Sequence, residues 1–389
     1  MTADRQPEQK MRGENVVQIR TGNEEKGRIM KTTALILAGG KGERFWPGSR
    51  TSHPKQFLCL TGDGKTMIRH TVERILPIVD MEDIYVSTNE RYRQLVYEQL
   101  PELPKENVIC EPVGRNTAPG IGLGAVYMRR KYGDAVMLVL PSDHQIAYED
   151  KYTEILKKAV ETAEDGGEGE RRLVTLGITP NAPETGYGYI KFDKASDTDG
   201  VCRVEKFVEK PDLENAKQYL ASGDYLWNSG MFIWKVSAIL ASMEKNMPEV
   251  YKGLTDIEAA IGSGDEAAVL KSAFEAMPSQ SVDYGILEKE DSIFVCPGDF
   301  GWDDVGSWLA LSRLNAPDEN GNVFMGNVES TSTKRTIVKA GDKLVAVVGL
   351  EDVVVVDTED ATLICSAEHT ADIKKLLEEL RSKGREEYL

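Results

Sequence analysis

A short apolar run that opens into a glycine-rich and then cationic segment constrains this chain most. The run Thr33–Ala38 is typical of a buried strand, and Gly39, Gly40 and Gly42 follow it at once. Glycine has no Cβ and tolerates positive φ, so the backbone N–H groups of such a loop can close on a polyanion. Residues 41–55 carry a net charge of +3 in a chain whose total is −17. The segment predicts a phosphate-binding loop after the first strand.

Two familiar phosphate motifs do not fit this segment. The stretch Gly40–Phe45 has Phe45 where the dinucleotide fingerprint needs its third small residue, which disfavours an NAD site. Residues Gly64–Thr66 resemble the end of a P-loop, but Cys59 stands where the first glycine belongs. The glycines alone also fit an ordinary turn with solvated charges, which remains the alternative.

Composition narrows the class of partner. With 389 residues, 41% of them hydrophobic, the chain is long enough for one large or two moderate domains. The excess of 64 acidic over 47 basic residues argues against nonspecific nucleic-acid binding and against an anionic membrane surface. A small anion held together with a metal ion is the expected partner.

Cysteine usage and hydropathy predict a soluble, cytoplasmic protein. The five cysteines are widely separated and include no Cys-x-x-Cys pair, so we expect reduced thiols and neither a disulfide framework nor a zinc site. No run is long and apolar enough to cross a bilayer, and residues 1–29 lack the apolar core of a signal peptide. We expect residues 1–29 to form a disordered extension.

Short β-rich runs alternate with helical periodicity beyond residue 30. The alternation is clearest over residues 84–88, 91–100, 108–110, 117–132 and 135–140. It predicts an α/β fold with helices on both faces of the sheet. Ligands of such sheets gather beyond the carboxyl ends of the strands, so the loops 39–55, 111–117 and 141–145 should lie together.

Asp143 lies in the loop after the most apolar strand. A carboxylate can meet a phosphate there only through a cation, so Asp143 is a candidate Mg²⁺ ligand. An Asp that caps the next helix is the alternative. We interpret the neighbouring His144 as a hydrogen-bonding loop residue rather than as a ligand.

The glycine-rich segment resembles the signature of the sugar nucleotidyltransferases, in which a Leu-Ala-Gly-Gly loop is followed by Arg and then by Pro-Lys. Here these elements are Leu37-Ala38-Gly39-Gly40, Arg44 and Pro54-Lys55. The stretches 45–47 and 53–57 are similar to the mannose-1-phosphate guanylyltransferase branch of that family. The resemblance extends over residues 31–389.

The resemblance implies roles for several of these residues. Leu37, Ala38, Gly39, Gly40 and Gly42 would bind the nucleotide, and Arg44 and Lys55 would be catalytic groups at the triphosphate. The family's Trp-x-Asp-x-Gly element falls on residues 302–306 and selects Asp304, rather than Asp303, as the second metal ligand beside Asp143.

The loop that begins at Glu111 is similar to the family's nucleoside-contacting loop. The candidate nucleotide-binding residues there are Glu111, Gly114, Arg115, Asn116 and Thr117. Glycine allows close approach, and the polar side chains supply the donors and acceptors that a purine edge needs. A plain helix cap with Pro119 at an early position explains the same residues, and both interpretations can hold together.

Three elements of the middle third match family elements around the sugar 1-phosphate. They are residues 184–190, 207–211 and 227–232. The resemblance makes Gly188, Glu209, Lys210 and Asn228 the sugar-phosphate-binding residues, with Lys210 also a catalytic group that pairs with the sugar phosphate. Taken singly, the aromatic residues there are more often packing residues, and Glu209-Lys210 is more often a surface pair.

The sequence pattern changes after residue 314 to short valine-rich runs at 336–339, 344–348, 353–356 and 362–365. We therefore expect a Rossmann-like mixed-sheet nucleotidyltransferase domain over 30–314 and a small β domain over 315–389. In the resembled family such a domain is a truncated β-helix. Residues 371–380 have the apolar spacing of a closing amphipathic helix, whose expected role is packing or dimerisation.

The resemblance implies a reaction of GTP with α-D-mannose 1-phosphate to give GDP-mannose and pyrophosphate. Mg²⁺ would be the cofactor, with Mn²⁺ as a substitute, and a homodimer is the expected assembly. A different hexose 1-phosphate or nucleotide is the alternative within the class. A noncatalytic sugar-nucleotide sensor is the alternative outside it.

Overall fold

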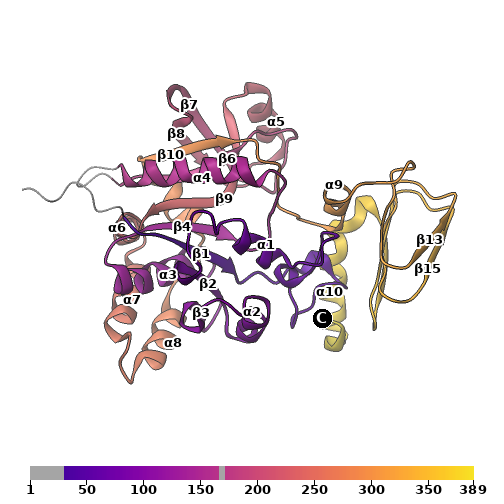
Figure 1. The fold of residues 1–389 in the computed structure, drawn as a ribbon, viewed down its shortest axis with the longest axis horizontal. Coiled ribbons are helices and arrows are strands. Elements are labelled where there is room, and N and C mark those ends of the chain that lie inside the picture. Colours follow the sequence, from indigo (N-terminus) through magenta and orange to yellow (C-terminus); the bar gives the residue numbers. More distant parts are fainter. Residues whose placement is uncertain (1–29, 166–170) are drawn as a thin grey trace, which may run out of the picture. The chain divides into compact units, whose positions relative to one another are not determined.

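A mixed nine-stranded sheet organises the larger part of the chain (Figure 1). The computed structural model describes residues 30–165 and 171–389, so the extension expected over residues 1–29 lies outside the described residues. The strand order is β3-β2-β1-β4-β9-β6-β10-β8-β7. The strands are β1 (Thr32–Ala38), β2 (Ile84–Asn89), β3 (Val108–Glu111), β4 (Val136–Pro141), β6 (Leu173–Ile178), β7 (Tyr189–Thr198), β8 (Val201–Val208), β9 (Tyr225–Lys235) and β10 (Ile293–Gly298).

Strand direction brings the predicted ligand loops to one edge of the sheet. β1 pairs in parallel with β2 and with β4, and β2 pairs in parallel with β3. β9 runs antiparallel between β4 and β6, which makes the sheet mixed. The loops after β1, β3 and β4 therefore leave the same edge, and the predicted α/β class with a mixed sheet is confirmed.

Helices cover both faces of this sheet. The helices of this layered part are α1 (Met67–Glu73), α2 (Arg93–Gln99), α3 (Thr117–Tyr132), α4 (Glu149–Glu164), α5 (Leu213–Ser222), α6 (Val236–Asn246), α7 (Pro248–Ala260) and α8 (Glu266–Ala276). The short helix α9 (Leu311–Leu314) instead shares an apolar cluster with Phe45 and Trp46. Leu35 and Met137 belong to the apolar cluster that also contains residues of α3, α6 and α7. Their neighbours Ala34 and Leu138, which alternate to the other face, are equally inaccessible to solvent. The central strands are thus buried on both sides, as their nearly continuous apolar sequence predicts.

The C-terminal part winds into short coils. Its strands are β12 (Val323–Met325), β13 (Val328–Thr331), β14 (Ile337–Lys339), β15 (Val345–Val348), β16 (Val353–Asp357) and β17 (Thr362–Ser366). β12, β14 and β16 stack in parallel in one small sheet, and β13 and β15 in another. The inward valines of successive coils, Val338, Val347 and Val355, form a core of their own. This arrangement confirms the predicted short β-helix.

The closing helix is α10 (Ile373–Ser382), as predicted. It packs against the 3-10 turn Glu43–Phe45 that follows the glycine-rich loop (Figure 1). Ile373 and Leu377 share an apolar cluster with Phe45 and Trp46 of that segment. The helix therefore joins the β-helix to the loop after β1.

Within the described ranges, no helix combines the length and apolar character that a bilayer span requires. All five cysteines lie in these ranges as free thiols.

Candidate functional site

The glycine-rich loop leaves β1 in an open conformation that two later residues hold. Among Gly39, Gly40 and Gly42, only Gly42 adopts a positive φ, of 62°. A Cβ on Gly42 would lie 2.4 Å from the Cβ of Lys55, so no side chain fits there. Gln56 donates from Nε2 to the carbonyl oxygens of Ala38 and Gly40, at 2.9 and 3.2 Å. Ideal Cβ atoms on Gly39 and Gly40 would meet nothing within 4 Å, so this backbone faces open space.

Lys55 ties the two predicted carboxylates together. Its side chain is only 6% exposed, and Nζ donates to Asp143 Oδ2 at 2.9 Å and to the backbone oxygen of Asp304 at 2.8 Å. An ammonium group carries three donors, so one remains for another partner. Burial raises the pKa of Asp143, but the Lys55 ammonium outweighs it and holds the pKa below its usual value. Asp143 is therefore a carboxylate at neutral pH.

A two-residue ladder explains how loops so far apart in the sequence meet. β5 (Gln145–Ile146) pairs antiparallel with β11 (Trp302–Asp303), immediately beside the two carboxylates. Trp302 also donates from Nε1 to His144 Nδ1 at 3.1 Å. Since Nδ1 accepts, the neutral ring carries its proton on Nε2. His144 is thus a hydrogen-bonding loop residue, as predicted.

Asp303 and Asp304, which are adjacent in sequence, have different hydrogen-bond partners. Asp303 accepts from Arg313 Nη2 at 2.9 Å and from the backbone N–H of Val305 at 2.7 Å, which occupies its carboxylate within the loop. Asp304 instead faces the cavity and accepts a hydrogen bond from the hydroxyl of Tyr187 at 2.8 Å. Of the two residues, Asp304 is the one that lines the cavity, and its role as a metal ligand stays a prediction.

Two cavities meet at Asp304 and His144. The first, of about 370 Å³, is lined by the glycine-rich loop, by Asp143 and by the cationic side chains of Lys41, Arg44, Lys55 and Lys374. The second, of about 340 Å³, is lined by the sugar-site candidates Gly188, Glu209, Lys210 and Asn228, together with Leu37, Thr117 and Tyr187. Asp304 and His144 line both. The site therefore has a cationic half and a polar half with the two loops between them.

Close packing brings the sugar-site candidates together. A Cβ on Gly188 would lie 2.5 Å from Glu209 Oε2 and 3.2 Å from the Cβ of Asn228, so a side chain at this position would displace the Glu209 carboxylate. Lys210, with a positive φ of 49°, donates to Glu209 Oε1 at 2.6 Å. Burial lowers the pKa of Lys210, but the hydrogen bond and the charge of Glu209 raise it by more. The pKa is therefore above its usual value, and the side chain is a cation.

Sequence reasoning missed Asp283 in this half of the site. Its Oδ1 accepts from Asn228 Nδ2 at 3.0 Å. Burial, and then the negative charge of Glu209, raise the pKa of Asp283 to about 6. Asp283 lies in no recognisable motif and 55 residues from Asn228, so only the fold reveals it. Two carboxylates and an amide around one cavity are suited to sugar hydroxyls.

The residues of the predicted nucleoside loop have different environments in the structure. Glu111 ends β3 and accepts from the hydroxyl of Ser87 at 2.8 Å, and burial raises its pKa to about 7. Asn116 caps α3 through Thr117, and Thr117 lines the second cavity. Gly114 has open space at its Cα.

Arg115 stands apart from these residues. Its guanidinium donates to the backbone oxygens of Phe274 and Glu275 at the end of α8. Like Glu111, Gly114 and Asn116, it lines neither cavity. These hydrogen bonds connect the loop to α8.

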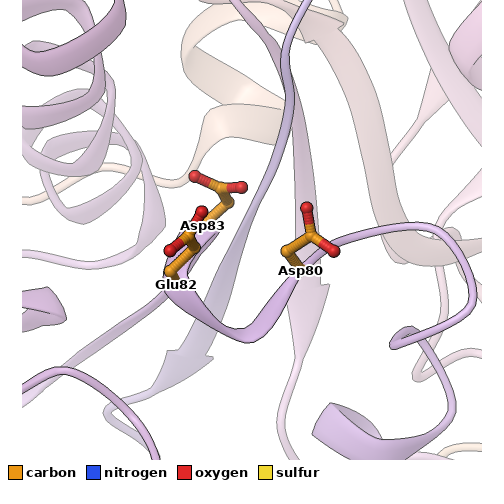
Figure 2. A group of neighbouring side chains, drawn as sticks. All are labelled: Asp80, Glu82 and Asp83. Atoms are coloured by element: carbon orange, nitrogen blue, oxygen red, sulfur yellow. The ribbon is translucent and has the colours of Figure 1, made fainter.

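A group of acidic side chains lies at the other edge of the sheet. Asp80, Glu82 and Asp83 cluster in the turn before β2 (Figure 2). Lys31 pairs with Asp83, and also with Asp80 at 3.6 Å. Tyr132 donates to Asp83 as well, at 2.7 Å. Lys31 offsets part of the charge of these three carboxylates, and the cluster is remote in sequence from the predicted metal ligands.

Comparison with known proteins gives two family matches. Residues 33–321 match the model described as nucleotidyl transferase, and residues 326–380 match that of the MannoseP isomerase/GMP-like beta-helix domain. The mannose-1-phosphate guanylyltransferase ManC of Salmonella typhimurium is 43% identical over 92% of this chain and 76% of its own length. The Escherichia coli mannose-1-phosphate guanylyltransferase is 43% identical over 92% of this chain and 75% of its own.

A solved structure agrees with these matches. The Thermus thermophilus protein described as mannose-1-phosphate geranyltransferase has a TM-score of 0.81 and 33% identity, over 90% of this chain and 100% of that chain. The likeness covers both the sheet and the β-helix.

Proposed function

The chain belongs to the mannose-1-phosphate guanylyltransferase family of nucleotidyltransferases, and we propose that it transfers GMP from GTP to α-D-mannose 1-phosphate, releasing pyrophosphate. The single observation that carries this reaction is the pair of cavities that share Asp304 and His144. An in-line displacement needs the attacking and leaving groups on opposite sides of the reacting phosphorus. The polar cavity would hold the sugar phosphate and the cationic cavity the departing pyrophosphate.

The reaction needs no nucleophilic side chain. The oxygen of mannose 1-phosphate attacks the α-phosphorus, the bond to the bridging oxygen breaks, and pyrophosphate leaves with that electron pair. A phosphate monoester is largely dianionic at neutral pH, so no general base has to remove a proton. The work of the protein is positioning and charge neutralisation.

Each charged side chain has a place in this scheme. Arg44 lies exposed in the cationic cavity and would neutralise the leaving pyrophosphate. Lys55 holds the two carboxylates and would direct its remaining donor at the triphosphate. Lys210 would pair with the attacking phosphate from the polar cavity.

The nucleotide would lie along the carboxyl edge of the sheet. The open backbone of residues 37–42 would bind its phosphates through N–H groups. Glu111 and Asn116 would read the guanine edge, with Gly114 and Thr117 close to the nucleoside. We keep Arg115 in this group only as a support of the loop, because its guanidinium is already engaged.

The two carboxylates fit a hard divalent cation. Asp143 and Asp304 line one cavity, each accepts a single hydrogen bond from a side chain, and carboxylate oxygens are the preferred ligands of Mg²⁺. A bound Mg²⁺, or Mn²⁺ in its place, would neutralise phosphate charge as a Lewis acid. Chelation should abolish turnover, and Asp143→Asn should raise the Mg²⁺ concentration needed for half-maximal rate. Full activity in excess chelator would contradict this assignment.

A pyrophosphate-release assay over a panel of nucleoside triphosphates and hexose 1-phosphates tests the reaction. We expect the highest kcat/KM for GTP with mannose 1-phosphate. Faster turnover of UTP or dTTP with glucose 1-phosphate would assign another sugar nucleotide. Absence of turnover with every pair would favour a sugar-nucleotide sensor.

We also propose a division at residues 30–314 and 315–389, a cytoplasmic location and a homodimer. The change from the mixed sheet to coiled strands supports the division, and the free thiols support the location. Exposed apolar side chains on the β-helix, Leu344, Val348 and Ile364, are 58–71% accessible and support association. Light scattering of the purified protein tests the dimer, and a monomeric mass would refute it.

A further inference from the structure

The closing helix brings a lysine to the cationic cavity. Lys374 belongs to α10, in the segment for which the sequence indicates only packing or dimerisation. It nevertheless lines the same cavity as Lys41 and Arg44 of the glycine-rich loop. A residue more than 300 positions away in sequence thus shares a phosphate-sized space with that loop.

The position of Lys374 on the helix is fixed. Ile373 and Leu377, on either side of it, are buried in the cluster that contains Phe45 and Trp46. One turn beyond Leu377, Arg381 pairs with Glu43 at 2.6 Å. An apolar contact and an ion pair therefore hold α10 against the loop, and the Lys374 backbone cannot shift independently of it.

The cavity contains cations without protein partners. Its three carboxylates each have a protein partner, since Glu43 pairs with Arg381, Asp143 pairs with Lys55, and Asp304 accepts a hydrogen bond from Tyr187. In the described part of the chain, Lys374 is exposed and makes no hydrogen bond or ion pair with a protein group. The same holds for Lys41 and Arg44. Three unpaired cations around one cavity indicate a polyanionic ligand.

The adjacent residue of the helix makes the contrast clear. Lys375 is also exposed, but its Nζ pairs with Asp372 at 2.7 Å and it does not line the cavity. The two lysines share helix, charge and solvent exposure. They differ in whether they face the cavity, so Lys375 is a matched control for Lys374.

We propose, on the basis of the function proposed above, that Lys374 binds the β- and γ-phosphates of GTP and the pyrophosphate that leaves. The cationic cavity shares Asp304 and His144 with the cavity of the sugar-site residues but is lined by none of those residues, and in-line transfer needs a separate place for the leaving group. A lysine ammonium binds phosphate as a compact point charge. The β-helix thereby supplies a substrate-binding residue through α10.

Steady-state kinetics with each substrate varied separately tests this role. Lys374→Ala should raise the KM for GTP roughly tenfold, the lower range for a lost contact with a charged group, and leave the KM for mannose 1-phosphate within about twofold. In the reverse direction the KM for pyrophosphate should rise and that for GDP-mannose should not. Lys374→Arg should recover most of the loss, and Lys375→Ala should behave as the wild type. Equal effects of the two alanine variants would overturn the proposal.

A binding measurement separates this inference from the proposed reaction. Calorimetry with inorganic tripolyphosphate and Mg²⁺ needs neither sugar nor turnover, and Lys374→Ala should bind about tenfold more weakly than the wild type. Unchanged affinity would refute the role of Lys374 even if the enzyme makes GDP-mannose. Lys374→Met keeps the apolar stem and gives the same test if the alanine variant lowers the melting temperature.

Discussion

Glu111 gives the sharpest quantitative test of the site. The carboxyl is buried at the end of β3, and burial raises its pKa from the ordinary value of 4.5 to about 7, although the Ser87 hydrogen bond opposes the shift. Each pKa unit corresponds to about 1.4 kcal/mol, so the ionised form is disfavoured in the folded protein by about 3 kcal/mol. Glu111→Gln keeps the size and removes the titration.

The sign of the pH effect follows from the two states. At low pH both the folded and the unfolded chain hold the proton on Glu111. As the pH rises from 4.5 toward 7, the unfolded chain releases this proton and the folded chain keeps it, so the free energy of unfolding falls. Above pH 7 both states are ionised and the contribution becomes constant. The stability advantage of Glu111→Gln should therefore grow by about 3 kcal/mol between about pH 4 and about pH 8.

Denaturant unfolding of the wild type and Glu111→Gln across this range measures the difference. The comparison at each pH cancels the other titrating groups, which the two proteins share. A difference that stays constant with pH would refute the raised pKa. Ser87→Ala removes a donor to the carboxylate, so it should shift the transition to higher pH.

The Glu111→Gln variant also tests the proposed contact with guanine. If the carboxylate accepts from guanine N–H groups, about one pH unit below the pKa only a tenth of the protein is competent, and the KM for GTP should rise about tenfold. The γ-phosphate titrates in a similar range, so the ratio of wild type to Glu111→Gln at each pH is the quantity to use. A ratio independent of pH would exclude Glu111 from nucleotide binding.

Other changes test the remaining assignments. Asp304→Asn should remove most turnover and Asp303→Asn much less, because Asp304 lines both cavities and Asp303 lines neither; equal losses in folded variants would contradict that choice. Arg44→Ala should lower kcat, because the transition state loses about 2–4 kcal/mol of stabilisation by analogy with a lost oxyanion donor. An unchanged kcat would show that Arg44 does not contact the leaving group. Lys210→Ala should raise the KM for mannose 1-phosphate more than that for GTP, and a rise for GTP alone would reassign it. Gly42→Ala should lower the melting temperature, since strain at positive φ costs about 1–3 kcal/mol, and an unchanged midpoint would show that the loop adapts.

Local patterns predicted the elements of this fold well. Residues 117–132 form α3 as expected, because apolar periodicity and an N-terminal cap are readable within a single segment. The glycine-rich loop was predictable in the same way. Its conformation was less so, because only the packing of Lys55 against Gly42 decides which glycine needs a positive φ.

Contacts between distant segments were beyond local reasoning. Asp304 was chosen over Asp303 through family resemblance, whereas the structure gives the physical reason in the ion pair of Asp303 with Arg313. Asp283 has no motif, and its role follows from its contact with Asn228. Lys374 looks in sequence like any exposed lysine of an amphipathic helix, and only tertiary packing turns it toward the cavity.

The ladder between β5 and β11 has a consequence for biosynthesis. Trp302 and His144, which it brings together, are 158 residues apart, and β10 inserts between β6 and β8 of the large sheet. A chain emerging from the ribosome therefore carries the Asp143 loop long before its partner exists, and β6 and β8 have no common neighbour until residue 293 is made. Such non-local pairing slows folding and leaves strand edges open meanwhile. The two carboxylates can come together only after Asp304 has been made, so the proposed metal site forms well after the loops that follow β1 and β4.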